Sequence, residues 1–254
     1  MQHLIGLHTL ILTQNSLSDL SPVSGLTALS HLDVDHNLVE DLTPLGRLGG
    51  LAFVDVAHNR VQDVGPLARL RALETLNVDG NEIQDLSPLQ GLSLRSLRAV
   101  QSEIDDIGVV ATLANLTKLD LSRNPISRFT PLSRLTGLEE LVLEDCGLTD
   151  ITVLRDLVNL KWLSLNGNSV TDLSPLSGLS SLEHLDLRHN EIGDLFALTG
   201  LSEVTTLALI GNHLEEIDAL ASMTALETAA LQENVISDVS TFGESAPSGV
   251  GSAG

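Results

Sequence analysis

An apolar frame of 22 residues, shortened once to 21, repeats along almost the whole chain and constrains its fold more than any other feature. The frame reads LxxLxLxxNxIxDLxPLxxL. Its eleven copies open at Leu7, Leu29, Leu51, Leu73, Leu94, Leu116, Leu138, Leu160, Leu182, Val204 and Leu226. A fixed period of this length is typical of a solenoid, in which each unit packs only on its neighbours. The repeat therefore predicts one elongated domain with an extended binding surface, and it contains no reaction chemistry.

Each unit begins with a short alternating stretch. In the ninth unit, Leu185 and Leu187 alternate with polar residues at the period of two that is typical of a β-strand. His184, Asp186 and Arg188 should therefore point away from the core. Because successive units stack, we expect the strands to pair in parallel and their outward side chains to form one continuous surface.

A polar residue follows each strand, where the backbone must turn inward. A primary amide at this place can satisfy the N–H and C=O groups of the turn. Two units carry Ser102 and Cys146 instead, and we interpret Cys146 as a hydrogen-bonding residue of the turn, not as a nucleophile. The other units carry Asn15, Asn37, Asn59, Asn81, Asn124, Asn168, Asn190, Asn212 and Asn234.

Most units then carry an acid followed by a Ser-Pro, Thr-Pro or Gly-Pro pair. The pair resembles an N-cap with proline at the first helical position, and acids suit helix N-termini. Few residues remain before the next unit, so we expect single helical turns, often of the 3₁₀ type. The acids at this repeat position are Asp19, Asp41, Asp63, Asp85, Asp106, Asp150, Asp172, Asp194, Glu216 and Asp238.

This pattern resembles the leucine-rich repeat, in the short form found in bacterial internalins and in a eukaryotic phosphatase-regulatory subunit. The resemblance extends from Leu4 to about Phe242. It implies an α/β leucine-rich repeat solenoid, or horseshoe, with parallel strands on the concave face and short 3₁₀ or helical turns on the convex face. Proteins of this family use the scaffold for many unrelated partners.

The expected domain organisation is a leucine-rich repeat domain of eleven units over residues 1–243 and a flexible Gly/Ser-rich tail or linker over residues 244–254. Leu4 already occupies a core position of an incomplete preceding unit, and solenoids normally close with polar capping units. We therefore expect the chain to be part of a longer protein with caps or fused domains.

Composition narrows the function. The net charge of −21 comes partly from the scaffold acids, and the lack of a basic stripe disfavours nucleic-acid binding. No apolar run reaches the length of a membrane span, and the first residues lack the features of a signal peptide. A single cysteine forms no intrachain disulfide, so the compartment stays unknown.

Two aromatic residues occupy outward strand positions in a chain with one Trp, four Phe and no Tyr. Trp162 lies between Glu140 and His184 in the neighbouring units, and tryptophan is strongly enriched in binding hot spots. The alternative is that its ring lies flat over leucines as partial cover for the core. Phe53 occupies the equivalent position earlier in the chain.

A basic cluster lies in the middle of the predicted concave face, where Arg98, Lys118 and Arg123 follow Arg95. It could receive an acidic segment of a partner. Alternatively, neighbouring acids such as Asp79 and Asp120 neutralise it within the chain.

Histidines gather at two places. His36 and His58 fall at the same position of adjacent units, with acids nearby, and imidazoles and carboxylates at such spacing can bind zinc. Nothing in the sequence fixes a tetrahedral set, so we predict neither a metal site nor a cofactor. The second group, His184, Asp186 and Arg188 with His189, suits polar recognition of a partner.

These observations favour a protein-interaction module, without catalytic residues, that binds a protein on its concave face, either in internalin-like adhesion or in intracellular regulation. The alternatives are a metal-dependent hydrolase on the His36/His58 patch and a purely structural spacer. The repeat phase also predicts that loss of the Asn168 amide destabilises the fold, whereas an outward Ser164 is replaceable at almost no cost.

Overall fold

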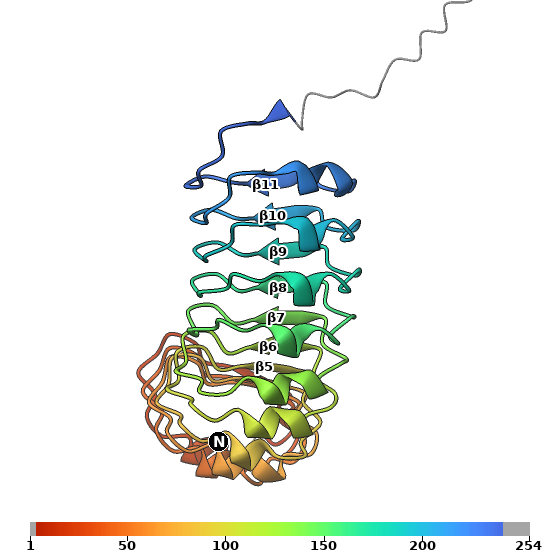
Figure 1. Ribbon diagram of the computed structural model, residues 1–254. Coiled ribbons are helices and arrows are strands. Elements are labelled where there is room, and N and C mark those ends of the chain that lie inside the picture. Colours follow the sequence, from red (N-terminus) through yellow and green to blue (C-terminus); the bar gives the residue numbers. More distant parts are fainter. Residues whose placement is uncertain (1–3, 241–254) are drawn as a thin grey trace, which may run out of the picture.

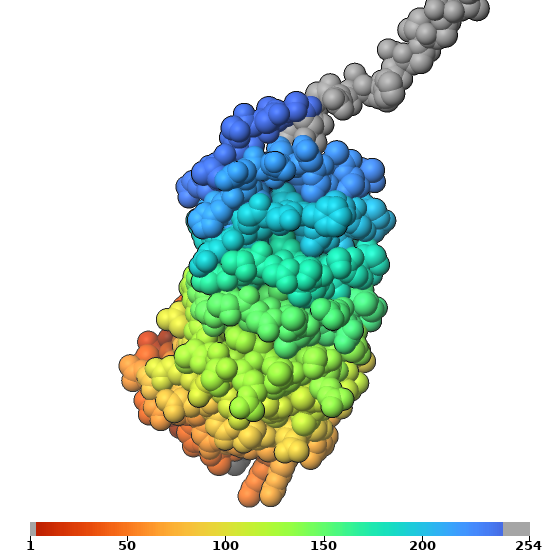
Figure 2. Space-filling view, viewed as in Figure 1, coloured from red at the N-terminus to blue at the C-terminus, as the bar shows by residue number. Residues whose placement is uncertain are grey.

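The computed structural model describes residues 4–240. The predicted tail at 244–254 lies outside the described residues, as does the last part of the predicted repeat domain. Within the described part the units stack as successive layers along a curved solenoid (Figure 1, Figure 2).

Eleven three-residue strands form one parallel sheet in sequence order, which confirms the predicted solenoid. Each strand pairs with its neighbours one repeat away, so Trp162 of β8 lies opposite His184 of β9. The unit of 21 residues keeps this register. Thr75 of β4 pairs with Ser96 of β5, the first residue of each strand, although they are 21 and not 22 residues apart. The strands are β1 Thr9–Ile11, β2 His31–Asp33, β3 Phe53–Asp55, β4 Thr75–Asn77, β5 Ser96–Arg98, β6 Lys118–Asp120, β7 Glu140–Val142, β8 Trp162–Ser164, β9 His184–Asp186, β10 Thr206–Ala208 and β11 Thr228–Ala230.

Short 3₁₀ helices line the opposite, convex side of the stack (Figure 1). Each has three or five residues, because little chain remains between the turn and the next strand. No α-helix occurs within residues 4–240, and no helix there is long and apolar enough to cross a bilayer. The helices are η1 Ser21–Val23, η2 Thr43–Leu45, η3 Gly65–Arg69, η4 Ser87–Leu89, η5 Gly108–Thr112, η6 Thr130–Arg134, η7 Thr152–Leu154, η8 Ser174–Leu176, η9 Phe196–Leu198 and η10 Asp218–Ser222.

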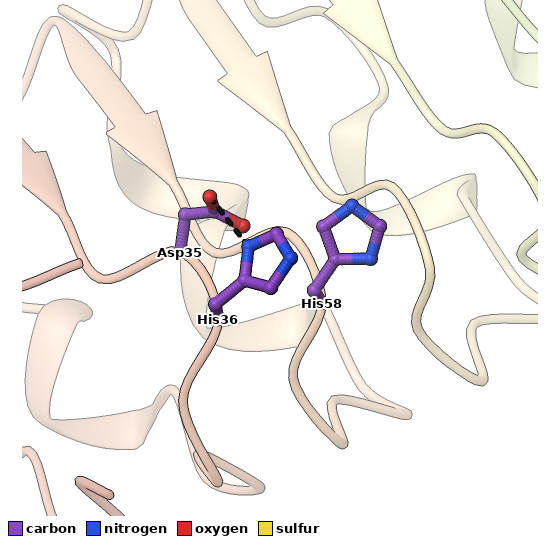
Figure 3. A group of neighbouring side chains, drawn as sticks. All are labelled: Asp35, His36 and His58. Carbon is purple, nitrogen blue, oxygen red and sulfur yellow. Dashed lines mark hydrogen bonds and ion pairs between the residues drawn. The ribbon is translucent and has the colours of Figure 1, made fainter. Parts of the chain in front are cut away.

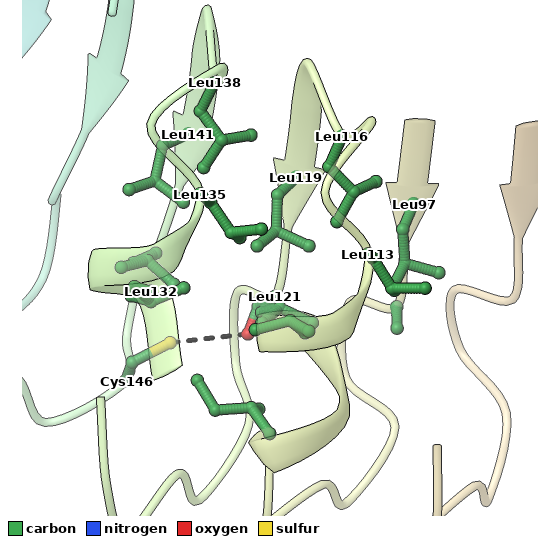
Figure 4. Close-up of a cluster of buried hydrophobic side chains, with 14 of the residues drawn as sticks. Leu97, Leu113, Leu116, Leu119, Leu121, Leu132, Leu135, Leu138, Leu141 and Cys146 are labelled. Carbon is green, nitrogen blue, oxygen red and sulfur yellow. Dashed lines mark hydrogen bonds between the residues drawn. The ribbon is translucent and has the colours of Figure 1, made fainter. Parts of the chain in front are cut away.

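Leucines from both sides of each unit fill the space between the sheet and the 3₁₀ helices (Figure 4). Leu97, Leu119 and Leu141, the central residues of β5, β6 and β7, lie in register and point into this core. Leu132 of η6 and Leu113 after η5 meet them from the convex side. Every unit depends on its neighbours for this burial, so the stack stabilises units that could not fold alone.

The asparagines form the predicted ladder of buried hydrogen bonds. The Asn168 amide nitrogen donates to the carbonyls of Leu143 and Leu165, at 2.7 and 2.8 Å, and its oxygen accepts the N–H groups of Cys146 and Leu148. Cys146 confirms the interpretation of the sequence, because its thiol donates to main-chain carbonyls, including that of Leu121. Burial raises the pKa of this thiol, which disfavours the reactive thiolate.

The capping expectation was wrong in one respect. The serine, threonine or glycine before each proline is the first residue of the 3₁₀ helix, and its side chain makes no capping hydrogen bond. Instead, in these units except that of η6, where Arg128 replaces the acid, the aspartate two residues earlier accepts that residue's backbone N–H, as Asp41 does from Thr43 at 2.7 Å. Asp150 binds the N–H of Thr152 in the same way at 2.8 Å, in a unit without the proline. The short carboxylate side chain reaches the free N–H group from outside the helix, so the acid performs the role expected of the hydroxyl.

This geometry predicts an acid-dependent contribution to stability. The backbone N–H and the hydroxyl of Thr152 lower the pKa of the Asp150 carboxyl, and hydrogen bonds likewise lower the pKa values of Asp19, Asp41 and Asp238. The folded-state pKa therefore lies below the unfolded value, so the stabilisation is present above about pH 4 and is lost as the pH falls through the folded pKa.

We expect Asp150→Asn to weaken the dependence of the free energy of unfolding on pH below about pH 4, because asparagine keeps an acceptor but loses the charge. Urea denaturation at a series of pH values measures this dependence. Asp156→Asn is the control, since Asp156 is exposed and its carboxylate accepts no hydrogen bond from any described residue. An equal change in both variants would contradict the capping role.

Candidate functional site

Outward side chains of neighbouring strands form the concave face. The first and third residues of each strand point outward, while the central residue is buried in β2 to β10. Side chains one repeat apart therefore lie side by side in columns that cross the sheet. This arrangement places most of the predicted site residues on one face.

Trp162 is the most exposed aromatic residue on this face. Its side chain is 45% exposed and its ring lies against that of His184, with ring centroids 4.6 Å apart and planes inclined by 39°. It follows Glu140 in the same column, as the register predicts. This exposure is compatible both with contact to a partner and with a ring that covers part of the core on its other side, so both interpretations of Trp162 stay predictions.

The surroundings of Trp162 contain polar groups that are already partnered. Ser164 is 3% exposed, and its hydroxyl donates to Glu144 at 2.7 Å, so the prediction of a freely replaceable outward Ser164 was wrong. The glutamate comes from the preceding unit and covers the serine. Arg188 forms an ion pair with Asp186, which fixes both predicted residues beside His184.

Sequence reasoning missed Asn166 in this region. Its amide oxygen is buried and has no hydrogen-bond partner among the described residues. It lies two residues after β8, at the repeat position that holds Glu144 in the preceding unit and Arg188 in the following unit. Nothing in the sequence distinguishes it from the other variable residues at this repeat position.

Phe53 also lies against a histidine, and here the two rings are stacked. Its ring lies parallel to that of His31, with centroids 4.0 Å apart and an angle of 5° between the planes. The two residues are opposite each other in β3 and β2, and both are partly buried. Phe53 therefore presents less free ring surface than Trp162.

The basic cluster is neutralised within the chain. Arg98 donates through two nitrogens to Asp79, at 2.9 and 2.8 Å, and lies 3.3 Å from Asp120. Burial raises the pKa of the Asp120 carboxyl, and hydrogen bonds from Ser122 oppose that shift. Arg98 therefore compensates two partly buried acids, one in the unit before its own and one in the unit after it. This agrees with the interpretation that neighbouring acids neutralise Arg98 within the chain.

The other three cations of the cluster are paired too, and Arg95 lies 3.6 Å from Glu74. Lys118 lies 2.7 Å from Glu140, and Arg123 lies 3.5 Å from Asp145. These pairs are exposed and each contributes little to stability. They leave no unpaired basic patch in the middle of the face.

His36 and His58 lie together, as their shared repeat position predicts. Both follow their strands by three residues and sit in the turns at the edge of the concave face (Figure 3). Their ring centroids are 4.3 Å apart, and the His36 Nδ1 lies 2.7 Å from the Asp35 carboxylate. Both histidines are exposed, so they line no closed pocket of the kind that enzymes use to exclude water.

A group of acids lies beside these histidines. Burial raises the pKa of the Asp55 carboxyl, hydrogen bonds from Ala57 and Asn77 oppose this shift, and the charges of Asp33 and Asp35 add to it. Asp33 and Asp55 are opposite each other in β2 and β3. This end of the concave face is therefore strongly negative.

The sequence model of the family described as "Leucine Rich repeats (2 copies)" matches residues 5–47, 114–156 and 158–203. The chain belongs to the leucine-rich repeat family. Comparison with curated protein sequences gives no match. Leucine-rich repeat proteins generally serve as non-enzymatic binding scaffolds, which agrees with the absence of reaction chemistry from the repeat frame.

Several solved leucine-rich repeat structures are similar to this one. An internalin of Listeria monocytogenes, inlF, superposes with a TM-score of 0.81 at 28% identity, over 95% of this chain and 78% of the internalin. A leucine-rich repeat protein of Leptospira interrogans gives a TM-score of 0.85 at 25% identity, over 90% of this chain and 61% of that protein. The ectodomain of an Arabidopsis thaliana receptor kinase, at 22% identity, shares the fold with a TM-score of 0.78, over 92% of this chain and 31% of the ectodomain chain.

Proposed function

We propose that this leucine-rich repeat domain binds a protein partner on its concave face, with Trp162 near the centre of the contact. The observation that carries the proposal is the partly exposed indole of the chain's single tryptophan, which lies against the tilted ring of His184 at an outward position of the sheet. Tryptophan is among the residues that contribute most to binding when a partner covers them.

The neighbourhood of Trp162 suits such a contact. The His184 ring lies against the indole and restricts its rotation on one side, which reduces the side-chain freedom that would be lost on binding. The Asp186–Arg188 and Lys118–Glu140 pairs lie nearby as a polar rim. Phe53 and the Arg98 and Arg123 pairs extend the proposed surface toward the N-terminal units.

Charge reversal at Arg98 is a poor test of this proposal. It would leave the partly buried Asp79 and Asp120 without their cation and so destabilise the fold itself. Variants at exposed positions are better suited, because they change the surface without changing the core.

Trp162→Ala is expected to weaken partner binding at least about tenfold, which corresponds to about 1.4 kcal/mol. Phe196→Ala provides a matched control, because Phe196 is an aromatic residue of η9 on the convex side and is 75% exposed. Quantitative mass spectrometry of proteins captured by the wild type and by each variant, followed by titration of the captured partner, measures the difference.

A partner that binds both variants equally well, at unchanged melting temperatures, would remove Trp162 from the account. The structural-spacer alternative predicts that outcome for every concave variant. We do not propose the hydrolase alternative, since His36 and His58 are exposed at an edge. Similarity to an internalin favours adhesion over intracellular regulation, and export of the protein by its native host is the observation that separates these roles.

A further inference from the structure

Three metal-ligating side chains converge at the edge of the second and third units. One ligand atom each from Asp35, His36 and His58 lies within 4.8 Å of the other two (Figure 3). Tetrahedral zinc places nitrogen and oxygen ligands about 3.3 Å apart, as follows from bond lengths of about 2.0 to 2.1 Å. Rotation of the two exposed imidazoles about their side-chain bonds can close this difference.

The backbone holds both histidines in a fixed position. His36 and His58 have positive φ values of 52° and 49°, at the repeat position just before the ladder asparagine. Their N–H groups donate to the carbonyls of Ala57 and Asp79 in the next units, at 3.0 and 2.7 Å. The spacing between the two Cα atoms is therefore set by the solenoid, not by a mobile loop.

Gly80 leaves room for the His58 ring. A Cβ atom at Gly80 would lie 2.5 Å from the His58 Nδ1, so a larger residue there would displace the imidazole. The glycine occupies the same repeat position as His36 and His58 in the following unit. The side chains of His36 and His58 thus lie side by side in adjacent units, and the next unit has a glycine beside His58.

The acids around this pair lack a compensating cation. Asp33, Asp35 and Asp55 form no ion pair with lysine or arginine within the described chain, whereas Arg98 compensates Asp79 and Asp120 three units further on. In addition, the Asp35 Oδ1 is buried and accepts no hydrogen bond from any described residue. A bound cation would supply the positive charge that this end of the face lacks.

We propose that Asp35, His36 and His58 bind a divalent transition-metal ion, with zinc as the representative ion. Two imidazoles and one carboxylate form a donor set that zinc accepts, and three protein ligands leave a fourth position open to water. The ion would join adjacent units at the edge of the concave face. This site is independent of the proposed contact at Trp162.

Zinc titration against a chromophoric chelator tests the site, on full-length protein that carries no polyhistidine tag. We expect the wild type to bind one equivalent of zinc saturably, and His36→Gln and His58→Gln to bind it at least about tenfold more weakly, because even the loss of a group that only supports a metal ligand usually costs about this much. The chain itself places Gln14 and Gln101 at this repeat position with positive φ, so the substitution suits the backbone.

His189→Gln is the matched control. His189 has the same left-handed backbone, with φ 52°, and its ring lies over Gly211 as that of His58 lies over Gly80, but no histidine precedes it in the neighbouring unit. It should bind zinc as the wild type does. The proposal is overturned if the wild type shows no saturable equivalent, or if all three variants bind zinc alike.

Discussion

Replacing Leu163 by alanine is expected to lower the free energy of unfolding by about 2 to 5 kcal/mol, the usual cost of removing a large side chain from a packed core. Leu163 is the central residue of β8 and is 0% exposed. It lies between Leu141 and Leu185 in the adjacent strands, so the cavity would open between three units. Such a cavity weakens both interfaces of the unit in a stack held together by nearest neighbours.

Urea denaturation followed by circular dichroism measures this loss. Trp162→Ala, one residue earlier in the same strand, should cost less than about 1 kcal/mol because its side chain is partly exposed. The pair of variants tests the alternation of inward and outward side chains. Equal losses at the two positions would contradict the register that places Trp162 on the concave surface.

Asn168→Ala is expected to cost about 1 to 3 kcal/mol, because it leaves buried turn groups without partners. The amide serves four main-chain groups at short distances, two as donor and two as acceptor. It links two consecutive units, because Leu143 and Cys146 lie in the preceding unit and Leu165 lies in its own. The loss should therefore exceed the net contribution of a single exposed hydrogen bond.

Asn159→Ala is the matched control for this prediction. Asn159 is exposed and its amide donates one hydrogen bond, of 2.8 Å, to the Thr136 carbonyl, so water can replace the partner. Its alanine variant should stay within about 0.5 kcal/mol of the wild type in the same denaturation assay. A small loss at both positions would show that the ladder does not stabilise the turns.

Repeat phase, strand direction and the ladder could be predicted because each depends on side chains within one unit and its copies. Leu185 and Asn168 behave as their repeat positions require. The basic cluster was left with two interpretations, because the sequence does not show how a side chain such as Arg98 reaches across units. The structure decides this through the pairs with Asp79 and Asp120.

Other features could not be predicted, because they depend on contacts between units or on the backbone of single residues. Ser164 is buried because Glu144, twenty residues earlier, folds over it. His36 and His58 sit at the edge because the residue before each ladder asparagine adopts a left-handed backbone, which the sequence signals only where the position holds glycine. The side-chain oxygens of Asn166 and Asp35 that have no hydrogen-bond partner among the described residues depend on the positions of surrounding side chains, for which the repeat has no signature.

The central claim, a partner seated over Trp162, is tested most directly by ¹⁹F NMR of the chain labelled with 5-fluorotryptophan. One tryptophan gives one signal, and no tryptophan of an unlabelled partner contributes to it. We predict that this signal is solvent-accessible in the free protein and becomes shielded and shifted when the partner saturates the domain. A signal that is already shielded in the free protein, or unchanged at saturation, would contradict the claim.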